Sequence, residues 1–191
     1  MKKTIFSLSL FLAAAGISAA PPEEEQYGAR IYFSADNFER GNYRDYFQTA
    51  FFGSLIRNCE GKTGTFAKVT YGESRPFKII PGKRYRLSFD AFNLGAKDLS
   101  RYNPSGAKTP FPQRFAFLDD SWKTVGEIKG KDIPGSETQS PPPAKWTAYS
   151  FEFECPRKAE MFTFSISSAW KNNWGPYLLS NVRLSEIKEE K

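Results

Sequence analysis

The sequence predicts an all-β domain folded as a two-sheet antiparallel β-sandwich. Three successive stretches near the carboxyl end support this, because apolar and polar side chains alternate there with the period of two typical of a half-buried strand. The apolar faces are formed by Tyr149, Phe151, Phe153 and Cys155, then by Phe162, Phe164 and Ile166, and finally by Leu178, Val182 and Leu184. Such strands need a second sheet to cover their apolar faces.

Similar patterns upstream predict the remaining strands. They are expected at residues 29–35, 65–71, 77–80, 84–91, 115–118 and 122–128. Residues 43–59 have no clear period and fit either a short helix or an irregular strand. Gly72-Glu73-Ser74, Pro81-Gly82 and Asp119-Asp120-Ser121 are expected to be turns.

The strand at 84–91 has two distinct faces. Tyr85, Leu87, Phe89 and Ala91 are expected in the core, whereas Arg84, Arg86, Ser88 and Asp90 lie on the opposite face. That polar face is either a solvated sheet surface or a hydrogen-bonding floor for a polar ligand.

Residues 1–20 are expected to be a secretory signal peptide. Lys2 and Lys3 precede an apolar run from Ile5 to Gly16, and small residues up to Ala20 form a cleavage site. A retained membrane anchor is the weaker alternative, because the apolar run of about 12 residues is shorter than the roughly 20 that span a bilayer. We therefore expect a secreted or periplasmic protein with a mobile leader at 21–28 and a single β-sandwich domain at 29–188.

The charge of the exported chain gives little support for a polyanionic partner. Loss of Lys2 and Lys3 leaves 25 basic and 21 acidic residues, a net charge of +4. These charges are scattered and do not form the basic stripe that nucleic-acid binding needs. We expect no nucleic-acid partner and no membrane span.

The chain resembles the galactose-binding-domain-like β-sandwich superfamily, which includes many carbohydrate-binding modules. The resemblance is carried by the pattern Trp-x-x-Tyr-Ser-Phe-x-Phe from Trp146, and by the final Leu-Leu-Ser-Asn-Val-Arg-Leu from Leu178. It implies a jelly-roll sandwich that binds carbohydrate. Many members carry an aspartate for a structural calcium where this chain has Ser180.

No cofactor is expected. Asp36, Asn37 and Glu39 supply oxygen atoms that could hold calcium, and an ordinary turn is the alternative interpretation. Cys59 and Cys155 are the only cysteines, and both lie in the exported part, where oxidising conditions permit a disulfide. We expect them to pair, with two buried thiols as the alternative.

The composition argues against most catalytic sites. The chain has no histidine, which removes the usual general base, Ser-His-Asp arrangements and the usual metal ligands. A glycosidase needs only two carboxylates, and Glu152 and Glu154 share one strand face about 7 Å apart. Polar alternation alone also accounts for that pair, so we expect no enzyme activity and keep a histidine-free glycosidase as an alternative.

Two loops carry the candidate ligand contacts. The loop from Trp170 to Tyr177 supplies Trp170, Asn172, Asn173, Trp174 and Tyr177, and the long loop at 93–112 supplies Arg101 and Tyr102. Exposed aromatic rings in such loops stack on sugar rings, and nearby amides reach hydroxyl groups. Trp122 and Trp146 are expected in the core, although Trp146 is out of step with the strand that follows it.

These features predict an exported module that binds a glycan or polysaccharide without catalysis. The alternative is a module of the cell envelope that contacts another protein or has a structural role. In that case the loop aromatics would plug the end of the sandwich or form subunit contacts.

Overall fold

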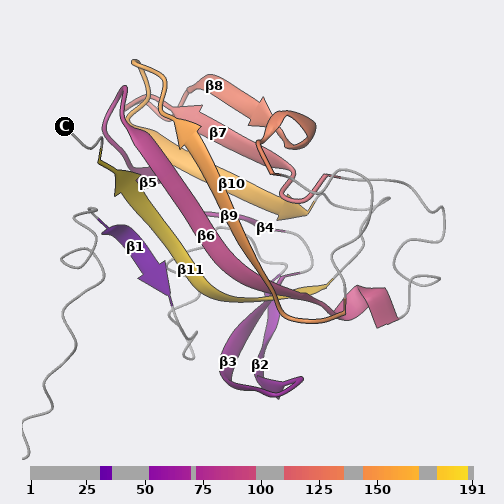
Figure 1. Ribbon diagram of the computed structural model, residues 1–191. Coiled ribbons are helices and arrows are strands. Elements are labelled where there is room, and N and C mark those ends of the chain that lie inside the picture. Colours follow the sequence, from indigo (N-terminus) through magenta and orange to yellow (C-terminus); the bar gives the residue numbers. More distant parts are fainter. Residues whose placement is uncertain are drawn as a thin grey trace, which may run out of the picture.

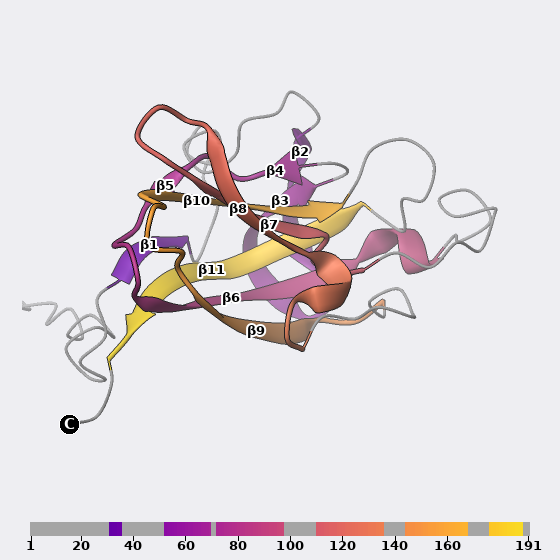
Figure 2. The same cartoon turned by 90° about the horizontal axis from the view of Figure 1, so that it is seen from above.

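The computed structural model describes residues 31–35, 52–69, 72–97, 110–135, 144–167 and 176–188. Two antiparallel β-sheets lie face to face in this part of the chain and form a β-sandwich (Figures 1 and 2). The predicted fold class is therefore confirmed. The predicted signal peptide and leader lie outside the described residues.

The larger sheet has six strands. They are β1 (Ile31–Ala35), β2 (Phe52–Cys59), β3 (Lys62–Val69), β6 (Arg84–Asn93), β9 (Thr147–Glu154) and β11 (Tyr177–Ile187). Their order is β2-β3-β11-β6-β9, and β1 pairs with the second half of β11. Strand β11 therefore joins the strands from the first part of the chain to β6 and β9.

The smaller sheet has five strands. They are β4 (Gly72–Glu73), β5 (Phe77–Lys78), β7 (Arg114–Leu118), β8 (Thr124–Lys129) and β10 (Met161–Ser167). Their order is β4-β10-β7-β8, with β5 also on β10. Two short 3-10 helices, η1 (Leu94–Lys97) and η2 (Gly130–Asp132), follow β6 and β8.

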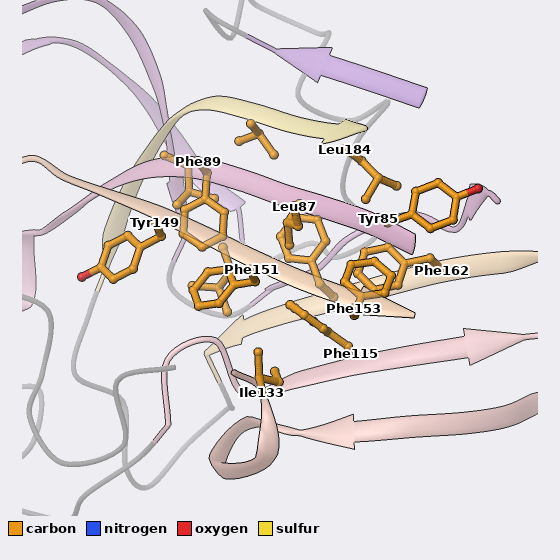
Figure 3. Close-up of a cluster of buried hydrophobic side chains, with 14 of the residues drawn as sticks. Tyr85, Leu87, Phe89, Phe115, Ile133, Tyr149, Phe151, Phe153, Phe162 and Leu184 are labelled. Atoms are coloured by element: carbon orange, nitrogen blue, oxygen red, sulfur yellow. The ribbon is translucent and has the colours of Figure 1, made fainter. Parts of the chain in front are cut away.

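The core between the sheets is built largely from aromatic rings (Figure 3). Phe153 of β9 stacks on Phe162 of β10 with ring centroids 4.5 Å apart, and Phe115 of β7 lies 5.2 Å from Phe153. Within the larger sheet, the rings of Phe89 of β6 and Phe151 of β9 are tilted relative to each other, with centroids 5.7 Å apart. These rings stand on the apolar faces that the alternation predicts, because side chains in a strand point to alternate sides.

One local prediction needs correction. Gly72 and Glu73 form strand β4 instead of a turn, because they pair with Ser165 and Ser167 of β10. In the stretch with no clear period, the irregular strand is the alternative that the structure confirms: it contains β2, whose pairing with β3 has two register shifts.

Strand β11 contains a bulge that the expected strict alternation does not include. Its pairing with β6 shifts between Ser180 and Arg183, and Asn181 has a left-handed backbone with φ 52°. Odd-numbered residues therefore face the core before the bulge, whereas even-numbered residues face it after the bulge. Leu179, Val182 and Leu184 face the core, whereas Leu178, expected there, lies on the other face.

That other face carries a second, smaller apolar cluster. Phe66, Phe92 and Leu178 are buried there beside the half-buried Trp146. The Trp146 ring lies 4.7 Å from Phe66, and its Nε1–H donates to the Cys59 carbonyl at 2.9 Å. This explains why Trp146 is out of step with β9, since it packs outside the main core.

The predicted disulfide is not present, because neither Cys59 nor Cys155 is bonded to another cysteine. Cys59 lies in the second cluster beside Trp146, whereas Cys155 lies in the main core beyond the far end of β9. The nine residues from Trp146 to Cys155 cover about 30 Å of extended chain. A disulfide needs Cα atoms within about 7 Å, so this arrangement keeps the two sulfur atoms apart.

Candidate functional site

The outward side of the six-stranded sheet carries a polar surface, here called the polar face. It consists of Arg84, Arg86, Ser88 and Asp90 of β6, Ser150 and Glu152 of β9, and Asn181 and Arg183 of β11. The register aligns these side chains in rows, with Ser88 between Arg183 and Ser150. All of them are exposed or half-buried, so the outward direction predicted for the β6 residues is confirmed.

One end of the polar face is organised by Glu152. Its carboxylate accepts hydrogen bonds from Arg86 Nη2 at 2.7 Å and from Arg84 Nη2 at 3.1 Å. The hydrogen bond from Arg86, together with the charges of both guanidinium groups, lowers the pKa of Glu152 below its ordinary value. Glu152 is therefore ionised at neutral pH, and it holds the two arginines in place.

The other end is organised by Asp90. Its Oδ2 atom forms an ion pair with Lys62 of β3 and accepts a hydrogen bond from Asn181 Nδ2 at 2.6 Å. The Lys62 ammonium also lies 4.7 Å from the centre of the Trp146 ring. The bulge in β11 thus has a role, because it turns the Asn181 amide toward Asp90.

Between these two ends lie the hydroxyl groups of Ser88 and Ser150. Asp90 follows Arg86 by four positions in β6. The arginine–glutamate group at one end and the Asp90 group at the other are therefore about 13 Å apart along the strand. Guanidinium groups donate hydrogen bonds, carboxylates accept them, and hydroxyls do both. The polar face therefore offers a fixed row of donors and acceptors to an elongated ligand rich in hydroxyl groups.

Sequence reasoning missed two members of this arrangement. Lys62 precedes the predicted start of its strand, and Asn181 owes its position to the bulge. Two consecutive polar residues, Ser180 and Asn181, interrupt the alternation of β11 and are the sequence signal that could have revealed the bulge.

Six predicted ligand contacts lie outside the described residues: Arg101, Tyr102, Trp170, Asn172, Asn173 and Trp174. The described residues that flank their two loops lie together. Leu94 N–H donates to the Pro176 carbonyl at 2.9 Å, and the rings of Phe111 and Tyr177 are 4.9 Å apart. Since Tyr177 also pairs with Asn93, these flanks lie at the Asp90 end of β6.

Tyr177 itself does not suit the predicted role of ligand contact. Its side chain lies in the core and is only 2% exposed. Burial also raises the pKa of its hydroxyl group. The first residue of β11 is directed inward by the strand, whereas the prediction treated it as part of the preceding loop.

Trp122 also differs from expectation. It was expected in the core but is 64% exposed, in the turn between β7 and β8. The prediction failed because strand β8 begins at Thr124, which leaves Trp122 in the turn.

The proposed calcium ligands Asp36, Asn37 and Glu39 lie outside the described residues. Ser180, which occupies the position of the superfamily's aspartate, is buried in β11. In the ranges that the structure describes, no group of three His, Cys, Asp or Glu side chains is arranged to hold a metal. The same ranges contain no helix of the length and apolarity needed to cross a bilayer.

Comparison with solved structures matches this architecture. The tandem CBM22-1–CBM22-2 domain of Xyn10C from Paenibacillus barcinonensis aligns with a TM-score of 0.50 and 12% identity, over 85% of this chain and 48% of that one. The fold is that of the galactose-binding-like β-sandwich. The chain spans about half of the tandem protein, and the identity supports a likeness in fold alone.

Two further carbohydrate-binding modules are similar to this chain. The CBM22-1 xylan-binding domain of the same Xyn10C has a TM-score of 0.49 and 10% identity, over 85% of this chain and 97% of that one. A CBM6 module of lichenase 5A from Cellvibrio mixtus, solved with cellotriose, has a TM-score of 0.42 and 10% identity, over 83% and 100%. No protein-family model and no curated protein matches the sequence.

Proposed function

We propose that this protein is an exported, non-catalytic module that binds a glycan, and that the polar face is its binding surface. The observation that carries the proposal is the row of exposed hydrogen-bonding side chains, fixed at one end by Glu152 and at the other by Asp90. Groups held by ion pairs lose little freedom when a ligand binds, which favours affinity. The same fold serves many functions, and the CBM22 tandem shows that carbohydrate binding is one of them.

We also propose that the predicted loop contacts Trp170, Trp174 and Tyr102 take part in binding. The described flanks of both loops lie at the Asp90 end of β6, which supports this proposal. An aromatic ring covers the apolar face of a sugar, whereas the polar face binds its hydroxyl groups. Together, the aromatic rings and the polar face would bind both the apolar faces and the hydroxyl groups of a glycan.

The state of Glu152 argues against a glycosidase. A general acid in such an enzyme needs a raised pKa, whereas Arg86 and Arg84 lower the pKa of this carboxyl group. Binding without turnover therefore fits the electrostatics of the polar face better. An assay for reducing-sugar release on any bound glycan tests this point, and release that disappears in Glu152→Gln would contradict it.

A glycan array followed by calorimetry tests the proposal. We expect the wild-type protein to bind at least one glycan with millimolar to micromolar affinity, and Arg86→Ala to weaken that binding about tenfold or more, because it removes a donor and releases Glu152. A double change of Trp170 and Trp174 to alanine should also weaken it while the fold survives.

Arg114→Ala is the matched control. Arg114 is also an arginine paired with a glutamate on an outward sheet face, since its Nε donates to Glu127 at 3.0 Å, but it is half-buried and lies on the smaller sheet. Binding should be unchanged in this variant. An array without hits, or equal losses in Arg86→Ala and Arg114→Ala, would overturn the proposal and favour a protein-interaction or structural module.

A further inference from the structure

The turn between β7 and β8 exposes an indole ring without a structural reason. Trp122 is the one large hydrophobic side chain that is exposed within the described ranges, with 64% of its surface accessible. The turn lies at the end of the sandwich that also carries the β9–β10 loop (Figure 1), where Glu160 N–H donates to the Leu118 carbonyl at 2.9 Å.

Hydrogen bonds hold this turn in one conformation. The Asp119 Oδ1 atom accepts from the backbone N–H of Ser121 at 3.0 Å and from that of Lys123 at 2.9 Å. The Asp119 carbonyl accepts from Trp122 N–H at 3.1 Å, and Asp119 N–H donates to the Lys123 carbonyl at 3.0 Å. The backbone under the indole is therefore fixed before any ligand arrives.

The conformation is unfavourable for the residue that occupies it. Trp122 has φ 66°, in the left-handed region where glycine or asparagine is common and a bulky residue is an outlier. With 64% of its surface exposed, the side chain contributes little to the core, and its φ makes tryptophan unfavourable in this turn. Strain of this kind at an exposed, rigid position indicates a binding role.

The surroundings of Trp122 favour a sugar over a protein surface. Asp120, Ser121 and Lys123 are exposed polar residues beside it, and Ser121 Oγ donates to Asp120 Oδ1 at 3.1 Å. A single indole of about 200 Å² is far smaller than the roughly 800 Å² that each partner contributes to a stable protein interface. It is sufficient to cover one face of a sugar ring, with the neighbouring carboxylate and hydroxyl within reach of the sugar's hydroxyl groups.

We propose that Trp122 forms a second glycan-binding site, separate from the polar face, in which the indole stacks on one sugar ring. The proposal rests on the proposed function and deepens it. Because Trp122 belongs to the β7–β8 hairpin of the smaller sheet and the polar face belongs to the larger one, the two sites would contact different parts of a polysaccharide. Immobilised polymers would then bind more tightly than short oligosaccharides.

Protein labelled with ¹⁵N in its tryptophan side chains tests the second site. The Nε1–H signals are followed during titration with cellotriose, xylohexaose and each glycan found on the array, and Trp122→Gly identifies the signal of Trp122. We expect this signal to move on titration, also in the Arg86→Ala variant. Trp122→Gly should weaken binding to the immobilised polymer about fivefold or more while its melting temperature stays the same or rises, because glycine relieves the strained φ.

The outcomes separate this site from the proposed function. Binding with an unchanged Trp122 signal would overturn the second site and leave the polar face supported. No binding to any of these glycans would overturn both. A Trp122 signal that moves with protein concentration in the absence of sugar would show a contact between copies of the chain and would also overturn the second site.

Discussion

Individual residues in this sandwich combine packing with specific hydrogen bonds. Tyr85 is fully buried between the sheets, yet its hydroxyl oxygen accepts a hydrogen bond from the backbone N–H of Ile80 at 2.7 Å. This bond anchors the segment between β5 and β6, where the chain crosses from the smaller sheet to the larger one. A buried N–H group that loses its acceptor costs more than the bond itself contributes.

At this scale we predict that Tyr85→Phe lowers the free energy of unfolding by about 1–2 kcal/mol, because the ring is kept while Ile80 loses its acceptor. Urea unfolding followed by fluorescence measures the change, and a circular-dichroism spectrum like that of the wild type confirms the fold. A variant as stable as the wild type would mean that water or another group replaces the hydroxyl.

At the scale of elements, the close approach of η2 to the segment before β7 depends on a glycine. Gly130 N–H donates to the Gln113 carbonyl at 2.6 Å. A Cβ atom at this position would lie 2.4 Å from Pro110 Cβ and 2.5 Å from the Pro112 carbonyl oxygen. Backbone atoms cannot yield as a flexible side chain can, so the two segments would have to separate.

We therefore predict that Gly130→Ala destabilises the fold by about 2–3 kcal/mol or more, the range of an overpacked site. Gly126→Ala is the control, since its nearest atom, Pro156 Cγ, is 3.3 Å away and belongs to a side chain. Differential scanning calorimetry should show a much larger fall in melting temperature for the first variant. Equal shifts in both would show that η2 can move away at low cost.

Elements also show how far sequence reasoning extends. In β6 and β9 the side chains alternate without interruption between the core and the outer face, so Tyr85, Phe151 and Glu152 were placed correctly. In β11 one extra residue at the bulge reverses the direction of Leu178, and an analysis that assumes strict alternation misses it although Ser180 and Asn181 interrupt the pattern. Trp122 was misplaced for a similar reason, because the end of a turn and the start of a strand look alike in sequence.

At the scale of the whole molecule, the order of the strands determines whether the two cysteines meet and which residues form the polar face. Pairing of Cys59 with Cys155 was expected because a signal peptide was predicted, but β2 and β9 occupy opposite edges of the larger sheet. The polar face could be predicted only in part, because its rows combine residues from three strands. Their neighbourhood depends on pairings between residues far apart in the chain, such as Ser88 with Ser150 and Ser88 with Arg183.

Cys155 is a buried thiol and is not in a disulfide, so its ionisation makes stability depend on pH. Burial raises the pKa of Cys155 from 9.0 to about 11, so between these values the unfolded chain has lost a proton that the folded one keeps. The stabilisation is present below about pH 9 and is lost as the pH rises through the folded value. Urea unfolding under reducing conditions should therefore show a steeper loss between pH 9 and 11 for the wild type than for Cys155→Ala. Parallel curves would contradict this.

The place of β11 also has a consequence for incomplete chains. This strand lies between β6 on one side and β1 and β3 on the other, so a polypeptide that stops before residue 177 leaves those strands without their common neighbour. Rows of unpaired backbone groups and a bare aromatic layer would then face water. We expect proteases to degrade such truncated products rapidly. The sandwich can therefore become stable only after β11 has been synthesised.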